Sequence, residues 1–292
     1  MKRVAFFVLV LLLGCGAPTV RPEGAVPAGS VIDMHVHVVF DRAAAAGMSA
    51  DRPPLPEAVV GLLADRRLAR VGAIVIAPQG DPDAVVAQND QLFALVKAHP
   101  QLFAIASVHP ADGVRALEEV DRVAGLGARM LKLHQNTQHF DLADSVVGAV
   151  VERAGARGLP VLFEGTMVLD PGTVGKILML AATHPKARLV MAHMGHAEFA
   201  QMLVFAQLTA YPWWPRNVYF DTSTTATLFA DSPYAPHLAW TIRRLGVDRV
   251  MFGSDFPVST PGEALDALVR LGFDAQELKA LTHDTAATLL KL

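Results

Sequence analysis

Short apolar runs alternate with longer amphipathic segments from residue 31 to the end of the chain. Some of these runs, such as residues 73–76 and 161–163, are apolar at every position. That pattern is typical of parallel strands that are covered on both faces. The pattern predicts eight strands, near residues 31–38, 73–78, 102–109, 129–134, 160–164, 188–194, 218–223 and 249–255. Eight parallel strands are the number that closes a (β/α)8 barrel.

Helix-start signals fall between the predicted strands. Asp81-Pro82 and Asp170-Pro171 each place a capping acceptor before a proline at the first helical position. Residues 260–263, Thr-Pro-Gly-Glu, predict a capping box after the last strand. Because these strand and helix units repeat without a break in composition, we expect one α/β domain, a (β/α)8 TIM barrel, with a doubly wound sheet as the alternative.

The first 30 residues differ from the rest of the chain. Two basic residues precede the apolar run 4–13, which is too short to span a bilayer but has the length of a signal-peptide core. Residues 12–15, Leu-Leu-Gly-Cys, resemble the bacterial lipobox, which implies a lipid on Cys15. An ordinary secretory signal is the alternative. The predicted parts are a lipoprotein signal peptide (1–14), a lipidated cysteine with a flexible tether (15–30) and the barrel domain (31–292). The expected location is a membrane surface facing the periplasm or the cell exterior.

Composition narrows the classes of function. The chain is 52% hydrophobic and 18% charged, so it has ample material for a folded core. Its formal charge of -3 argues against a broad basic field for nucleic acid and favours a small-molecule substrate. Cys15 is the single cysteine, so any metal site must use histidine and carboxylate ligands. No pattern in the sequence indicates the oligomeric state.

Titratable side chains follow several strands at their carboxyl ends, where barrel enzymes hold their active sites. These residues are Asp33, His35, His37, Lys132, His134, Glu164, His193 and Asp255. Buried charges are costly unless they are paired or bind a metal. His35 and His37 leave the same face of a strand, although a His-x-His pair alone is as easily a packed pair. Together with His193 and Asp255 they form a donor set that suits zinc, iron or manganese.

Four segments carry a family resemblance: residues 33–37 (Asp-Met-His-Val-His), 127–134 (Gly-Ala-Arg-Met-Leu-Lys-Leu-His), 192–195 (Ala-His-Met-Gly) and 252–257 (Phe-Gly-Ser-Asp-Phe-Pro). In this order they resemble the motifs of the amidohydrolase superfamily, in its amidohydrolase 2 branch of metal-dependent hydrolases and decarboxylases. The resemblance implies a TIM barrel with one divalent metal held by His35 and His37. Zinc is the metal expected first, with iron or manganese as alternatives. It also implies that Asp255 binds metal and shuttles a proton, and that His193 is a ligand or an acid/base group.

The fifth strand departs from the family pattern. Relatives end this strand with His-Thr-Gly, whose histidine binds metal, whereas here Glu164 stands in that place. Three hypotheses follow, in order of preference. Glu164 replaces the histidine as a metal ligand, or it acts as a general base or substrate clamp, or its presence indicates that the metal site is degraded. Lys132 matches a lysine that is carbamylated between two metals in binuclear relatives. We instead predict that Lys132 is a charge partner for Glu164 or Asp255 and contacts the substrate.

Three more residues are candidate substrate contacts. His134 shares a face with the preceding lysine, His109 ends the third strand, and Asp221 ends the seventh. The segments 39–55 and 224–236 follow the first and seventh strands and are long enough to cover a site.

The predicted function is that of a metal-dependent hydrolase. A metal-activated water attacks an amide, ester or lactone carbonyl, while Asp255 takes the proton and His193 stabilises the oxyanion. One alternative is a non-oxidative decarboxylase of an aromatic or unsaturated acid. The other is a non-catalytic binding lipoprotein, which would follow if the replaced histidine abolishes metal binding.

Overall fold

The computed structural model describes residues 26–167 and 169–292. Eight parallel strands pair in sequence order into one barrel: β1 (Val31–His37), β2 (Leu68–Ile74), β3 (Leu102–Ser107), β4 (Met130–Leu133), β5 (Val161–Phe163), β6 (Leu189–Met191), β7 (Val218–Asp221) and β8 (Val250–Met251). Backbone bonds join the chain after β8 to β1, with the Met34 N–H donating to the Phe252 carbonyl (3.2 Å) and the Asp255 N–H to the His35 carbonyl (2.8 Å). The predicted (β/α)8 fold is confirmed.

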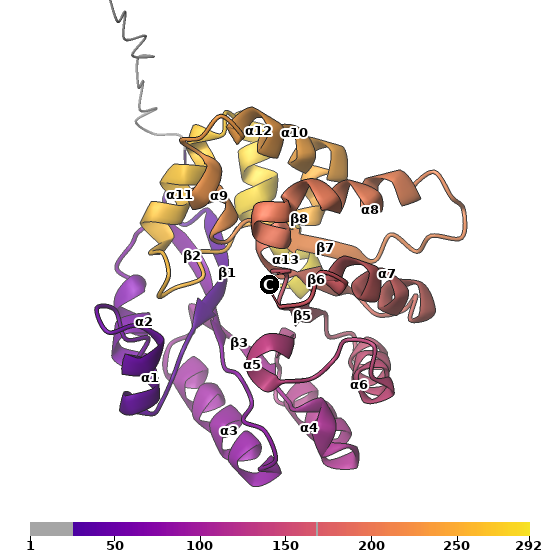
Figure 1. Cartoon of the computed structure of the whole chain (residues 1–292). Coiled ribbons are helices and arrows are strands. Elements are labelled where there is room, and N and C mark those ends of the chain that lie inside the picture. The colour runs from indigo at the N-terminus through magenta and orange to yellow at the C-terminus, as the bar shows by residue number, and fades with distance from the viewer. Residues whose placement is uncertain (1–25, 168) are drawn as a thin grey trace, which may run out of the picture.

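Helices surround the strands (Figure 1). They are α1 (Arg42–Met48), α2 (Pro56–Leu62), α3 (Pro82–Ala98), α4 (Val114–Gly125), α5 (Gln135–Gln138), α6 (Ser145–Ala156), α7 (Thr173–Thr183), α8 (Leu203–Leu208), α9 (Thr225–Phe229), α10 (Ala235–Leu245), α11 (Pro261–Arg270), α12 (Ala275–Lys279) and α13 (Thr285–Leu290). Further helical turns, which are not regular α-helices, are η1 (Pro110–Asp112), η2 (Ala192–Met202), η3 (Val247–Arg249) and η4 (Ala280–Asp284). No helix in the described ranges is both long and apolar enough to cross a membrane. The predicted signal peptide and Cys15 lie outside the described residues.

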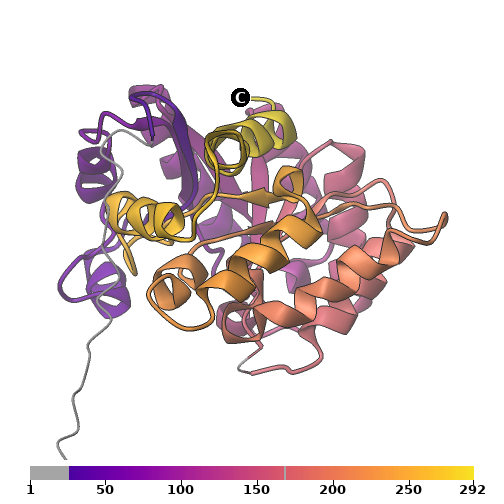
Figure 2. The same cartoon turned by 90° about the horizontal axis from the view of Figure 1, so that it is seen from above.

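Two apolar clusters make the core. The larger lies between strands and helices, and the smaller fills the barrel interior with side chains such as Met34, Phe103 and Leu162. The interior cluster also contains Leu289 and Leu290 of α13. The last helix therefore closes the amino end of the barrel, and Figure 2 shows this yellow helix next to the label C at one end of the molecule.

Along the first strand, the alternation of side chains between the two faces of the sheet is interrupted, so that its phase changes. Ile32 and Met34 belong to the interior cluster, yet His35 and His37 lie at the opposite end near Asp255. The pairing of β1 with β2 is irregular between Asp33 and Val36, which allows this change of phase. The irregularity thus places both histidines at the carboxyl end of the barrel.

One predicted strand was misplaced. The second strand was expected at 73–78 but runs over Leu68–Ile74. Its early part contains Arg70 and Gly72, which hide the apolar pattern. Gly72 is needed there, because a Cβ atom would lie 2.7 Å from a ring carbon of Phe103.

Two of three predicted helix starts are confirmed. Asp81 accepts the Ala84 N–H at 3.0 Å, and Thr260 forms a capping box with Glu263. The Asp170-Pro171 start is wrong, because α7 begins at Thr173. Asp170 instead accepts the Gly172 N–H at 2.8 Å in the preceding turn.

Candidate active site

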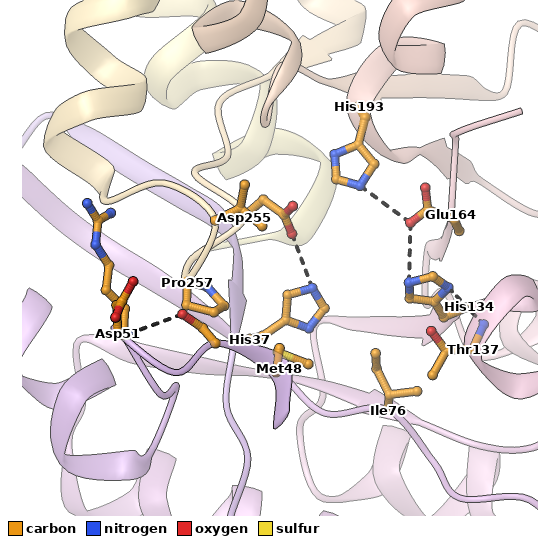
Figure 3. Close-up of a pocket in the computed structure, with 13 residues that line it drawn as sticks. His37, Met48, Asp51, Ile76, His134, Thr137, Glu164, His193, Asp255 and Pro257 are labelled. Atoms are coloured by element: carbon orange, nitrogen blue, oxygen red, sulfur yellow. Dashed lines mark hydrogen bonds and ion pairs between the residues drawn. The ribbon is translucent and has the colours of Figure 1, made fainter. Parts of the chain in front are cut away.

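A pocket of about 500 Å³ opens at the carboxyl ends of the strands (Figure 3). Its wall contains five of the ten polar residues that the sequence singled out: His37, His134, Glu164, His193 and Asp255. The volume is in the range of pockets that hold small molecules. Residues far apart in the chain therefore meet at one end of the barrel, as predicted.

Three side chains at this end of the barrel can converge on one cation. His35, His193 and Asp255 each offer one ligand atom within 4.8 Å of the others. Asp255 Oδ1 lies 3.3 Å from Nε2 of His35 and 3.2 Å from Nε2 of His37. His193 and Asp255 have φ values of 59° and 57°, a backbone region that non-glycine residues seldom adopt. Such strain persists where the surrounding structure requires a particular side-chain direction.

Asp221, at the end of β7, contacts two of the histidines. Its Oδ2 lies 2.9 Å from Nδ1 of His35, and its Oδ1 accepts the His193 N–H at 2.9 Å. The Ser223 hydroxyl bonds to Asp221 and lies 2.9 Å from Nδ1 of His193. These contacts assign the Nδ1 proton in each ring, which leaves Nε2 free to bind a cation. Asp221 is fully buried and does not line the pocket, so its predicted substrate contact gains no support.

The buried donor atoms fit a divalent metal. Among the described residues, Nε2 of His35 is buried without a hydrogen-bond partner. Since Nδ1 of this ring is held by Asp221, its Nε2 lone pair faces the Asp255 carboxylate, and two electron-rich atoms at 3.3 Å need a cation between them. Two imidazoles and a carboxylate are a common set for zinc and related metals.

Glu164 lies across the pocket from Asp255. Its Oε2 is 3.4 Å from Nε2 of His193 and 3.4 Å from Nε2 of His134, as Figure 3 shows. Burial raises the pKa of this carboxyl, but the charges of His193 and Lys132 outweigh burial and hold the pKa well below its usual range. Glu164 therefore adjoins the three convergent ligand atoms without being one of them. Its role as a ligand stays a prediction.

The charges of this cluster act on each other. Burial lowers the pKa of His193, yet the carboxylates of Glu164 and Asp255 raise it to about 10 in the metal-free chain. Burial and the charge of Lys132 lower the pKa of His134 to about 3. His193 thus carries a proton where no cation is bound, and His134 is neutral.

Lys132 lies beneath the pocket. Its side chain is fully buried, and among the described residues its Nζ has no hydrogen-bond partner. Burial lowers its pKa, while Glu164 and Asp255 raise it. The predicted charge pairing therefore acts at longer range than a direct ion pair.

His109 lies apart from the pocket. It is fully buried, its Nε2 is 2.8 Å from the Gln138 carbonyl, and its Nδ1 accepts the Ala111 N–H at 3.2 Å. Backbone groups thus occupy both ring nitrogens, and the structure does not bring this residue to the predicted substrate site.

Only one of the two long segments reaches the pocket. The segment after β1 supplies Met48, Asp51 and Arg52 to the wall. The sequence predicted this cover but did not single out these residues, because exposed charges in a loop carry no distinguishing pattern. The segment after β7 instead packs Phe229 on Phe199, with ring centres 5.1 Å apart.

Comparison with known families decides the affiliation. The model of the amidohydrolase family matches residues 32–292. The chain belongs to this family. The amidohydrolase thus combines the family barrel with a glutamate at the end of β5.

Known proteins resemble this amidohydrolase mainly in fold. A curated uncharacterised protein, y4mH of Sinorhizobium fredii, is 38% identical over 63 residues, and the match covers 20% of this chain and 21% of that protein. A solved structure assigned as a 2-pyrone-4,6-dicarboxylic acid hydrolase of Pseudomonas putida has a TM-score of 0.63 and 23% identity, covering 90% of this chain and 97% of that one. A dihydroxybenzoic acid decarboxylase of Polaromonas sp. JS666, solved with manganese, has a TM-score of 0.69 and 16% identity over 90% and 97%.

Proposed function

We propose that this amidohydrolase is a metal-dependent hydrolase of a small molecule with an amide, ester or lactone carbonyl. The convergence of His35, His193 and Asp255 within 4.8 Å carries the proposal. A divalent metal bound there would polarise the carbonyl and lower the pKa of water towards about 7. Zinc is proposed first, and manganese gains support from the decarboxylase structure.

The chain's own groups divide the remaining work. The neighbouring histidines hold the pKa of Asp255 well below its usual range despite its burial, so this carboxylate is ionised and can accept a proton from water. It then returns that proton to the leaving group. Glu164 and His134 form the opposite wall and orient polar groups of the substrate. Lys132 adds positive charge near the negative charge that develops during attack.

Metal content tests this proposal directly. The full-length protein, purified without chelator, is expected to contain about one zinc, iron or manganese per chain, and Asp255→Asn is expected to lose most activity while it keeps the fold. Turnover of esters, lactones and amides would support the hydrolase, whereas release of carbon dioxide from aromatic acids would replace it with a decarboxylase. Absence of metal after reconstitution would favour the binding protein.

Glu164→Ala separates the roles of the unusual glutamate. If Glu164 is a ligand, the variant is expected to lose the bound metal, as measured by elemental analysis. If the variant keeps its metal and loses only turnover, Glu164 acts on substrate or proton. Glu198→Ala is a matched control outside the pocket wall.

We also propose that the protein is exported and anchored through a lipid on Cys15. Two basic residues, the apolar run 4–13 and the lipobox-like residues 12–15 support this proposal. The anchor would leave the domain on the membrane surface.

A further inference from the structure

The charges of the barrel are separated between its two ends. We define the amino face by the turns that precede β2 to β8: residues 63–67, 99–101, 126–129, 157–160, 184–188, 209–217 and 246–249. These turns contain eight Lys or Arg residues and two acidic residues, Asp65 and Asp248. The C-terminal segment 271–292, which lies at the same end, adds Lys279 and Lys291 and three acidic residues, Asp274, Glu277 and Asp284, of which Glu277 and Asp284 are paired with Arg243 and Lys279. The chain as a whole has a formal charge of -3, so the basic face is a local feature.

The opposite end has the reverse composition. We define the carboxyl face by the segments that follow the eight strands: residues 38–55, 75–81, 108–113, 134–144, 164–172, 192–202, 222–234 and 252–260. These segments contain eleven acidic residues and two basic ones, Arg42 and Arg52. Because all strands run parallel, the two faces lie at opposite ends of the barrel, with the pocket at the acidic end.

Several cations of the amino face have no acidic partner in the described part of the chain. Arg66, Lys186 and Arg216 are exposed and form no ion pair there. Arg129 and Arg188 donate to the backbone carbonyls of Lys291 and Leu289. These guanidinium groups keep their full charge, because a carbonyl does not neutralise it.

The described chain enters the barrel on the same face. The Gly29 N–H donates to the Arg66 carbonyl at 2.8 Å, and the Ser30 N–H to the Arg67 carbonyl at 3.0 Å. Ten residues separate Cys15 from Val26, a span of at most about 40 Å when fully extended. A membrane-bound residue 15 would therefore hold the amino face close to the bilayer.

Exposed aromatic side chains lie in one turn of this face. Tyr211 and Trp213 are 54% and 60% exposed, with ring centres 5.9 Å apart. Prolines flank Trp213-Trp214 in this turn. Tyr and Trp are enriched at membrane interfaces, where one side of the ring is apolar and the other is polar.

We propose that the amino face is a docking surface for an anionic phospholipid bilayer, which binds through the unpaired cations and holds the pocket away from the membrane. Charge complementarity and the exposed rings of Tyr211 and Trp213 carry this inference, and the entry point of the chain is compatible with it. It does not depend on the proposed reaction or on acylation of Cys15. Each Lys or Arg near such a surface strengthens binding about fivefold, so the face as a whole gives substantial affinity.

Vesicle binding of the full chain with Cys15→Ser tests the proposal. The triple variant Arg66→Gln, Lys186→Gln, Arg216→Gln removes three exposed cations that make no ion pair in the described part, so the fold is expected to persist. Its binding to vesicles of phosphatidylglycerol and phosphatidylcholine is expected to fall on the order of 100-fold. The matched control, Arg42→Gln, Arg115→Gln, Lys176→Gln, makes the same charge change on or near the carboxyl face and is expected to bind like its parent.

Three outcomes would overturn the proposal. Equal binding by the triple variant and the control would show that the amino face is not involved. Equal binding to vesicles of phosphatidylcholine alone would assign the affinity to the apolar run 4–13. Loss of vesicle binding on addition of a DNA duplex, with tighter binding to that duplex, would identify nucleic acid as the ligand. Metal content and turnover enter none of these readouts, so the outcome is separate from that of the proposed reaction.

Discussion

At the residue scale, a buried carboxylate can govern a site without touching the substrate. Asp221 is fully buried, and it bonds to the ring of His35 and the backbone of His193. The position of Asp221 at the end of an apolar run is visible in the sequence, but the contacts between β7 and β1 depend on the closed barrel. The sequence therefore indicated a functional Asp221 and misjudged its neighbours.

Asp221→Asn is expected to weaken metal binding about 10- to 100-fold, because the amide no longer fixes the proton on the ring of His35 and disturbs the Ser223 hydroxyl that contacts the ring of His193. Competition with a chelator measures the apparent Kd. Asp248→Asn, a charge-matched variant in η3, is expected to leave the Kd unchanged. An unchanged Kd in Asp221→Asn would show that this contact does not position the ligands.

At the element scale, β2 shows that a strand is hard to predict from its sequence where close packing requires a glycine. Gly72→Ala is expected to destabilise the protein by about 1–3 kcal/mol, because the new methyl group would meet the Phe103 ring at 2.7 Å. Denaturant unfolding measures the change. Gly61→Ala in α2 meets no atom within 4 Å and is expected to be neutral or stabilising. A neutral Gly72→Ala would mean that the strand shifts to admit the methyl group.

The start of α12 makes stability depend on pH. Glu277 completes a capping box with Asp274 and pairs with Arg243 at 2.6 Å, and the hydrogen bonds from Arg243 lower its pKa from 4.5 to about 2 although burial opposes the shift. A lowered folded-state pKa contributes stability above pH 4.5 that is lost as the pH falls towards about 2.

Glu277→Gln is therefore expected to cost about 1 kcal/mol at neutral pH, where the partly exposed ion pair and cap are both present. The difference from wild type should shrink through the acid range. Urea unfolding at several pH values measures it. A difference that stays constant with pH would assign the cost to packing instead of charge.

The elements that the sequence predicted well have strong local signals. Asp81 before a proline and the capping box at Thr260 predicted two helix starts correctly, and most apolar runs predicted the positions of their strands within a few residues. The failures need information from other elements. Asp170 bonds within a turn before α7, and the change of phase in β1 depends on its pairing with β2.

At the scale of the whole molecule, the proposed lipid anchor and the proposed docking face would make separate contributions to membrane binding. Cys15→Ser in a bacterial host is expected to release the protein from membranes after a high-salt wash, which removes proteins held by charge alone. Fractionation and immunoblotting measure the release. Retention after the wash would contradict the lipid anchor. Glu198→Gln, expressed at the same level, serves as a control for handling.

The barrel as a whole was predictable because eight strand signals and four motif segments agree. The wall of the pocket was harder to predict from the sequence, because the segments that line it lack a regular pattern of apolar residues. Arg52, for example, pairs with Glu263 of α11 at 2.7 Å, a contact that requires the first and last units of the barrel to be adjacent.

The position of α13 has a consequence for biosynthesis. Leu289 and Leu290 complete the apolar cluster inside the barrel, and Phe252 donates its N–H to the Leu281 carbonyl at 2.8 Å. During synthesis, water cannot be excluded from this interior until α13 has left the ribosome. A chain truncated before α13 would therefore expose an open apolar surface to chaperones and proteases.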